Sequence, residues 1–226
     1  DNGQVYRQRI IDYGMADYSQ IVDEGKNAFV HVLITPRERT FFSYGGCTEK
    51  ISFESTIPDA KLVYCSGYEV RMFGDRLIEY ISNSSGKICF DIAAPNIIEK
   101  GSSGFEAMKD RASILFASAD EYKSLYGEHF SRSSPFKNGK NLEVLVLKKG
   151  AKGSEAFDRR GGVSPHVFSR EDISDEDFVN TCGAGDAYAA GFLSAMLRGG
   201  PVEEAGLIGT YVAGMVIRQH EPYLLL

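Results

Sequence analysis

Residues 180–186, with the sequence NTCGAGD, are those whose types and spacing best suit chemistry. The small residues at 183–185 let the backbone approach a ligand closely. They stand directly before a helical pattern, where backbone N–H groups and the helix dipole favour an anion. Asp186 falls in the first turn beside that anion site. A carboxylate next to an anion hole suits phosphoryl transfer to a hydroxyl, because the carboxylate takes the proton while the N–H groups stabilise the transferring group.

Two other interpretations of this segment start from the same residues. In the simpler one, Asp186 complements the helix dipole and the glycines form a turn; spacing alone does not decide against it. A dinucleotide-binding fingerprint fits worse, because position 188 is Tyr where a third glycine is needed and no first strand precedes it. A Walker A phosphate loop is also excluded, since Gly139-Lys140 is followed by Asn141 and position 134 is Ser.

The elements that must position this segment are short apolar runs alternating with helical patterns. This alternation predicts βαβ units and an α/β fold with a mostly parallel sheet covered on both faces. Residues 36–38 predict a turn between the first two strands, residues 160–161 predict a hairpin turn, and 128–141 form a polar surface loop. Strands are expected at 28–35, 39–44, 61–66, 87–92, 113–117, 142–147, 155–159 and 162–168, and helices at 3–13, 70–82, 119–126, 183–198 and 201–219.

Composition narrows the classes of function. The chain has 226 residues, 43% of them hydrophobic, and a net charge of −6, without the basic surplus typical of a nucleic-acid binder. It has no apolar run long enough to span a membrane and no signal-peptide pattern at its start, so we expect a cytoplasmic protein. Four scattered cysteines without a CxxC pair argue against a disulfide framework or a zinc site.

Four stretches carry a family resemblance. Residues 180–193, NTCGAGDAYAAGFL, resemble the C-terminal signature of the PfkB family, the ribokinase-like carbohydrate and nucleoside kinases. Residues 147–157 resemble its nucleotide-binding strand–loop–strand, 116–122 its Asn-x-x-Glu segment, and 28–46 its stretch ending in a glycine turn, all in the family's order. The resemblance implies a three-layer ribokinase-like α/β fold with a central, mostly parallel sheet. It implies a single domain over 1–226, with 28–46 contributing to a small β lid.

The resemblance also implies ATP and Mg²⁺ as cofactors, a small-molecule acceptor, and roles for matching residues. Asp186 would be the catalytic base, and the anion hole would be formed by Gly183, Ala184 and Gly185. The nucleotide cleft would be lined by Lys149, Gly150 and Gly153, with Asn180 and Thr181 near the phosphates. Ser118 stands where the family has Asn, and Glu121 would act on magnesium through water; a solvated helix face is the simpler interpretation of Glu121.

The sequence departs from the family in three places. Ser118 is shorter than Asn and has no amide donor, which predicts a weaker phosphate–magnesium network. Residues 219–222, Gln-His-Glu-Pro, replace the family's usual end and argue against its monovalent-cation loop. The N-terminal strands that hold the family's sugar-binding Asp and Gly-Gly-x-x-x-Asn are also missing upstream, so we expect an incomplete fold. A longer natural protein, a shortened chain and a short gene product remain open explanations.

The resemblance implies that the acceptor is a nucleoside or a sugar. The Arg-Thr-Phe-Phe segment at 39–42 and the helix from 184 look most like adenosine kinase-like members, and ribokinase or fructokinase types are the alternative. Phe42, Tyr44 and Tyr68 could stack on a base, although aromatic residues in strands more often belong to the core. A non-catalytic nucleotide-binding relative also stays open, as a monomer or homodimer does. The proposed chemistry has no covalent enzyme intermediate, so Cys182 should be dispensable.

Overall fold

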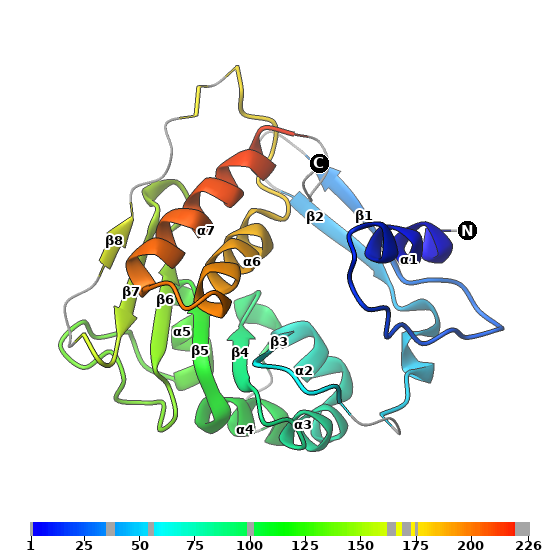
Figure 1. The fold of residues 1–226 in the computed structure, drawn as a ribbon, viewed down its shortest axis with the longest axis horizontal. Coiled ribbons are helices and arrows are strands. Elements are labelled where there is room, and N and C mark those ends of the chain that lie inside the picture. Colours follow the sequence, from blue (N-terminus) through cyan, green and yellow to red (C-terminus); the bar gives the residue numbers. More distant parts are fainter. Residues whose placement is uncertain are drawn as a thin grey trace. The chain divides into compact units, whose positions relative to one another are not determined.

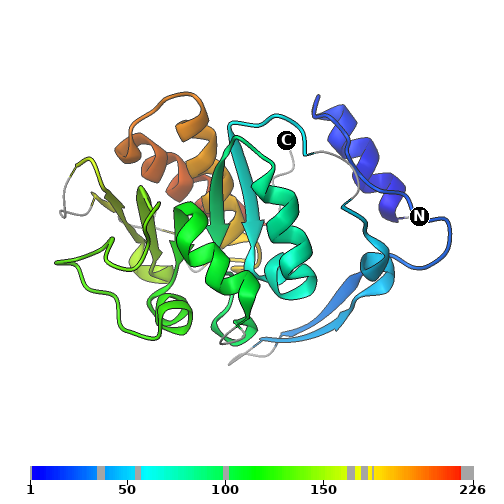
Figure 2. The ribbon, with the colours of Figure 1, turned by 90° about the horizontal axis from the view of Figure 1, so that it is seen from below.

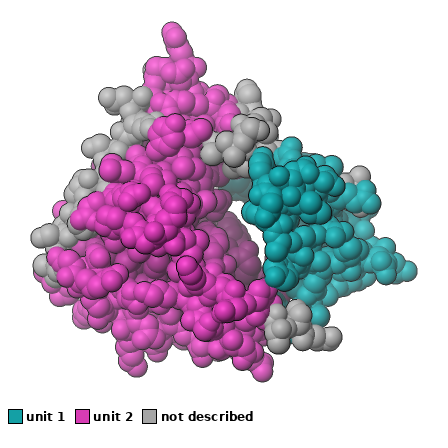
Figure 3. Space-filling view, viewed as in Figure 1, with its two compact units in different colours: residues 1–55 teal, residues 56–226 magenta. Residues whose placement is uncertain are grey.

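The computed structural model describes residues 2–34, 39–53, 57–98, 102–161, 166–168, 173–174 and 176–219. The chain divides into two compact units, residues 1–55 and residues 56–226, coloured separately in Figure 3. No helix in these described residues is long and apolar enough to cross a membrane.

The first unit consists of one helix and a two-stranded sheet. Helix α1 (Asn2–Asp12) precedes strands β1 (Phe29–Ile34) and β2 (Arg39–Tyr44), which pair antiparallel from Phe29–Tyr44 to Ile34–Arg39. Both strands are confirmed, while the turn expected at 36–38 lies outside the described residues. Gly46 has φ 56°, and a Cβ there would lie 2.3 Å from the carbonyl oxygen of Lys26, so only glycine fits where the chain leaves β2.

The second unit is built on a six-stranded sheet in the order β3-β4-β5-β6-β7-β8 (Figure 1). The first four strands are parallel, and β7 and β8 are antiparallel to their neighbours. Runs such as ASILFA and VLVLK form these strands because a sheet covered on both faces buries nearly every side chain. The strands are β3 (Leu62–Ser66), β4 (Lys87–Asp91), β5 (Ala112–Ala117), β6 (Val144–Lys148), β7 (Ser154–Asp158) and β8 (His166–Phe168).

Helices cover both faces of this sheet, as Figure 2 shows. Helices α6 (Ala184–Leu197) and α7 (Val202–Ile217) cover one face, where Phe116 of β5 and Phe192 of α6 pack edge to face at 5.5 Å. The other face carries α2 (Gly67–Phe73), α3 (Asp75–Ser82), α4 (Ser103–Arg111) and α5 (Ala119–Tyr126). The predicted three-layer α/β fold is confirmed.

The single helix predicted over 70–82 is wrong. The structure has two helices, α2 and α3, because Gly74 between them takes φ 51° and ψ −127°. Helix α4, which was not predicted, packs here: a Cβ on Gly104 would lie 3.3 Å from the Cα of Gly74. The hairpin of 155–159 and 162–168 is confirmed as β7 and β8, with residues 162–165 outside the described part.

The parallel strands bring polar residues to one edge of the sheet. Ser66 ends β3 opposite Asp91, which ends β4. Ala117 of β5 pairs with Leu147 of β6, so the next residues, Ser118 and Lys148, reach the same carboxyl edge. Ligands of open α/β sheets bind outside this edge, which therefore positions the candidate site.

Candidate active site

The N-terminus of α6 is open at the carboxyl edge. Gly183 is its N-cap residue with φ 76° and ψ −5°, a left-handed conformation that glycine adopts without strain. No side chain caps this terminus among the described residues. The preceding loop is fixed by Asn180, whose Oδ1 accepts from the Cys182 backbone N–H at 2.7 Å. The first turn, which includes Ala184 and Gly185, thus presents backbone N–H groups and the positive end of the helix dipole.

Lys148 and Asp91 lie beside this first turn. The Nζ atom of Lys148 is 3.7 Å from the position that a Cβ on Gly185 would occupy. It donates to both carboxylate oxygens of Asp91, at 2.7 and 2.9 Å. Asp91 is only 2% exposed. Neither residue was predicted from the sequence. Each is a charged residue at the end of an apolar strand, Asp91 in KICFD and Lys148 in VLVLK, and this pattern could have indicated them.

Asp186 stands in the first turn of α6, where the sequence placed it. Partial burial of its carboxyl raises the pKa above that of an ordinary Asp, and the charges of Asp91 and Glu69 raise it further. The ammonium of Lys148 works in the opposite direction. A carboxyl with a raised pKa is a stronger proton acceptor when ionised, which suits a general base.

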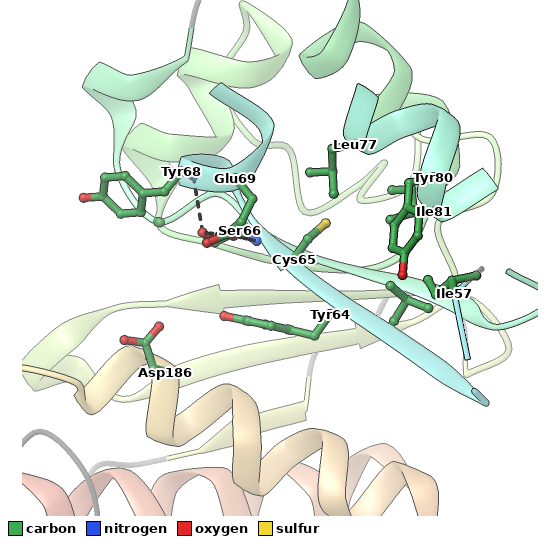
Figure 4. A pocket seen from close by; sticks show the side chains of 12 residues that line it. Ile57, Tyr64, Cys65, Ser66, Tyr68, Glu69, Leu77, Tyr80, Ile81 and Asp186 are labelled. Carbon is green, nitrogen blue, oxygen red and sulfur yellow. Dashed lines mark hydrogen bonds between the residues drawn. The ribbon is translucent and has the colours of Figure 1, made fainter. Parts of the chain in front are cut away.

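A pocket of about 550 Å³ opens in front of Asp186 (Figure 4). In this view the carboxylate of Asp186 and the hydroxyl of Tyr64 point into the same space, and Tyr68 lies across from them. Ser66 and Glu69 form its rim as a capping box, since the Ser66 N–H donates to Glu69 Oε2 at 2.7 Å. The lining is completed by Ile57, Val63, Cys65, Leu77, Tyr80, Ile81 and Ala93. Tyr68 is therefore brought to Asp186, while Phe42 and Tyr44 belong to the first unit.

The loop predicted to line a nucleotide cleft is a tight turn between β6 and β7. Gly150 and Gly153 have φ 55° and 79°, and the Lys149 N–H donates to the Gly153 carbonyl at 2.8 Å. Lys149 also forms an ion pair with Glu155, a residue that is 4% exposed. Arg132 binds the same carboxylate at 2.5 and 3.2 Å. Burial opposes ionisation of Glu155, but the hydrogen bonds from Lys149 and Arg132 outweigh it and lower the pKa.

Ser118 and Glu121 begin α5 at the same edge. They form a reciprocal capping box, in which the Ser118 N–H donates to Glu121 Oε2 at 2.7 Å and the Glu121 N–H donates to Ser118 Oγ at 3.2 Å. Glu121 is 8% exposed, so the interpretation as a solvated helix face is wrong. The described residues contain no group of three His, Cys, Asp or Glu side chains able to hold a metal ion.

Asn180 and Thr181 form hydrogen bonds within and beside the loop before α6. Asn180 Nδ2 donates to the Gln219 carbonyl at 3.2 Å, which ties this loop to the end of α7. The Thr181 carbonyl accepts from the Ala184 N–H at 3.3 Å. Of the replacement segment 219–222, only Gln219 is described. The carboxyl edge thus combines the glycine turn, Asp186, the 149–153 loop and the start of α5.

The sequence matches the pfkB family carbohydrate kinases over residues 1–225. An uncharacterized sugar kinase of Archaeoglobus fulgidus is 29% identical over 135 residues, covering 59% of this chain and 50% of the relative. The matched parts cover half or less of the length of curated relatives such as this one.

Two solved structures show the same fold. An adenosine kinase from Sinorhizobium meliloti matches with a TM-score of 0.82 and 21% identity, over 100% of this chain and 72% of the other. A probable sugar kinase from Rhizobium etli CFN 42 matches with a TM-score of 0.82 and 20% identity, over 100% and 71%. The resemblance seen in the glycine turn is confirmed: the chain belongs to the pfkB family of carbohydrate kinases.

Proposed function

We propose that this chain transfers the γ-phosphoryl group of ATP to a hydroxyl of a small acceptor, with a nucleoside favoured over a free sugar. The observation that carries the proposal is the first turn of α6, where Asp186 stands next to the helix N-terminus at Gly183 and faces a pocket. This is the arrangement that an in-line transfer to a hydroxyl needs.

Asp186 is the base in the proposed reaction. Its carboxylate takes the proton of the acceptor hydroxyl as that oxygen forms its bond to phosphorus and the bond from phosphorus to ADP breaks. The N–H groups at Gly183–Gly185 stabilise the charge on the transferring group. The raised pKa of Asp186 brings the base closer to the pH at which the protein would work.

The nucleotide would lie along the edge between the 149–153 loop and the start of α6. Gly150 and Gly153 provide the positive-φ conformations that this turn requires, and Lys149 adds a positive charge. Magnesium brought with the nucleotide would neutralise phosphate charge. The residues fit such an ion, because Mg²⁺ usually takes one or two carboxylates together with phosphates and water. Glu121, at the start of α5, is the carboxylate we assign to it through water, with Ser118 in the place of the family's Asn.

The preference for a nucleoside depends on the aromatic side chains of the pocket. Tyr64 and Tyr68 flank the space in front of Asp186, and a planar base can stack on a tyrosine ring. A sugar as acceptor is the second candidate, because the polar rim of Ser66 and Glu69 could bind hydroxyl groups. The strands of the first unit, within 28–46, are proposed as a lid that excludes water during transfer.

Acceptor-dependent release of ADP tests the proposal. The purified chain would be assayed with magnesium-ATP and adenosine, cytidine, ribose, fructose or no acceptor, with Asp186→Asn alongside. We expect nucleoside-dependent ADP that falls by about 10²–10⁴-fold in Asp186→Asn. Tyr68→Leu should raise KM for the nucleoside more than for a sugar. Binding of ATP without turnover by folded wild-type protein would instead identify a non-catalytic relative.

A further inference from the structure

The Asp91–Lys148 ion pair is costly for stability alone. Both charges lose their hydration when they are buried, and well-packed apolar residues often replace such pairs without loss of stability. Asp91 is almost fully buried, and the side chain of Lys148 is 20% exposed. The pair joins the ends of β4 and β6 with β5 between them, at the edge where ligands of such sheets bind. Its position therefore points to a functional role.

The carboxylate of Asp91 is held rigidly. Its Oδ1 accepts from Lys148 Nζ at 2.7 Å and from the Ala93 N–H at 3.0 Å, and its Oδ2 accepts from Lys148 Nζ at 2.9 Å. Ala93 has φ 67°, in the left-handed region that is unfavourable for residues other than glycine. The chain thus bends sharply after β4 and places a backbone donor on the same oxygen as the lysine.

Lys148 keeps a donor for another partner. An ammonium has three N–H groups, and the two oxygens of Asp91 take at most two of them. The Nζ atom lies against Gly185, at the open N-terminus of α6, and its charge acts on Asp186. The ammonium is therefore placed between a fixed carboxylate and the turn that offers its N–H groups to an anion.

We propose that Lys148 is a catalytic residue that contacts the transferring phosphoryl group beside the Gly183–Gly185 turn, and that Asp91 is the positioning residue that holds its ammonium there. This inference rests on the proposed phosphotransferase function. Lys148 takes no part in the proton transfer: the acceptor oxygen bonds to phosphorus, the bond to ADP breaks, and the acceptor proton goes to Asp186. The lysine supplies charge and one hydrogen bond, which strengthen as negative charge gathers on the transferring oxygens.

The test compares Lys148→Met with Lys61→Met, which removes the same charge from an exposed residue just before β3, at the opposite edge of the sheet. We expect Lys148→Met to lower kcat by about 10²–10³-fold, with KM for the acceptor little changed, as for loss of one transition-state donor. Lys61→Met should stay within about threefold of wild type, since its exposed side chain lies away from the carboxyl edge. The acid limb of the kcat/KM profile should move to higher pH in Lys148→Met, because the charge that lowers the pKa of Asp186 is gone.

Lys148→Met also leaves Asp91 buried without its cation, which can unfold the chain. The double variant Asp91→Asn/Lys148→Met removes both charges. It should recover the melting temperature but not the turnover, and Lys148→Arg should recover part of the turnover. Turnover of the double variant within about threefold of wild type would show a purely structural pair and overturn the inference.

The affinities for ATP and AMP in the presence of magnesium, measured by isothermal titration calorimetry, distinguish failure of this inference from failure of the proposed function. Lys148→Met should raise the Kd of ATP at least about tenfold, because one charged hydrogen bond is lost, and should leave the Kd of AMP unchanged. Equal effects on both nucleotides would overturn the inference even in a chain without turnover. Wild-type protein that neither binds ATP nor turns over would overturn both proposals.

Discussion

Gly191 of α6 and Gly209 of α7 lie against each other where the two helices cross: a Cβ on Gly191 would lie 3.1 Å from the Cα of Gly209. The same Cβ would come within 3.0 Å of the Ile208 carbonyl oxygen. The two helices thus pack backbone against backbone. This contact fixes the direction of α6, and with it the position of its first turn.

Gly191→Val should therefore destabilise the second unit. Its side chain would force the helices apart, and overpacking of this kind costs about 1–3 kcal/mol. Urea unfolding followed by circular dichroism measures the change. Ala190→Val is the matched control, because Ala190 is on the exposed face of the same helix and should change the free energy of unfolding by less than about 1 kcal/mol. Equal losses in both variants would contradict the role of the contact.

Asp186→Asn should make the protein more stable at neutral pH while it loses turnover. Burial raises the pKa of Asp186 in the folded protein, so folding favours its protonated form. That contribution is present below the unfolded pKa of about 3.9 and is lost as pH rises through the raised folded value. Asp186→Asn has no carboxylate charge at position 186 to desolvate. Its melting temperature should therefore exceed that of the wild type near pH 7 and equal it near pH 3. A variant less stable than wild type at both pH values would contradict this account.

Glu155→Gln should loosen the 149–153 loop, which we propose binds the nucleotide. The change removes the buried carboxylate that binds both Lys149 and Arg132, and charged hydrogen bonds of this kind contribute about 1.5–3 kcal/mol. Because its pKa is lowered in the folded state, Glu155 stabilises the protein above the unfolded pKa and loses this effect as pH falls through the folded value. Melting temperature against pH and KM for ATP measure the two consequences.

Glu143→Gln is the control for Glu155→Gln. Glu143 forms an ion pair with Lys87 at 2.5 Å, but both side chains are well exposed, and such pairs contribute about 0–1 kcal/mol. It should leave both the melting temperature and KM for ATP nearly unchanged. A loss as large as that of Glu155→Gln would show that burial does not distinguish the two pairs.

Two substitutions of Ser118 distinguish its role as the N-cap of α5 from a role in binding the phosphates. Ser118→Ala removes the acceptor for the Glu121 N–H and should cost about 0.5–2 kcal/mol. Ser118→Asn keeps a good N-cap and adds an amide donor, so it should preserve stability and lower KM for ATP. If both variants changed turnover only in proportion to stability, Ser118 would have no part in nucleotide binding.

The four thiols should differ in reactivity. Cys65 and Cys89 are buried, and burial raises the pKa of each to about 12, so neither forms a thiolate readily. Cys47 and Cys182 are partly exposed. Titration with an aromatic disulfide reagent should therefore find two fast thiols in the folded protein and four after unfolding. Cys182→Ala should keep its turnover, since the proposed transfer forms no bond to sulfur.

The strands and the site could be predicted to different extents. The runs that form β3 to β6 became strands within two residues of their expected bounds, because a buried parallel strand needs nearly continuous apolar residues. Of the strand expected over 162–168, only β8 (His166–Phe168) is described. Helix α4, SGFEAMKDR, was not predicted because its small and charged residues give little helical periodicity. Asp186 was predictable from the glycines before it. The Asp91–Lys148 pair was not, since 57 residues separate its members and only the strand order brings them together.

The order of the chain has a consequence for folding during synthesis. Strands β4, β5, β6 and β7 leave the ribosome before α6 and α7, which supply the apolar cover for one of their faces. That face has no helices to cover it until residues 184–217 are synthesised. Folding intermediates with an exposed apolar surface of this kind are prone to aggregate. The helix that covers them also carries Asp186, so the proposed reactive centre is completed at the moment when the sheet is finally protected from water.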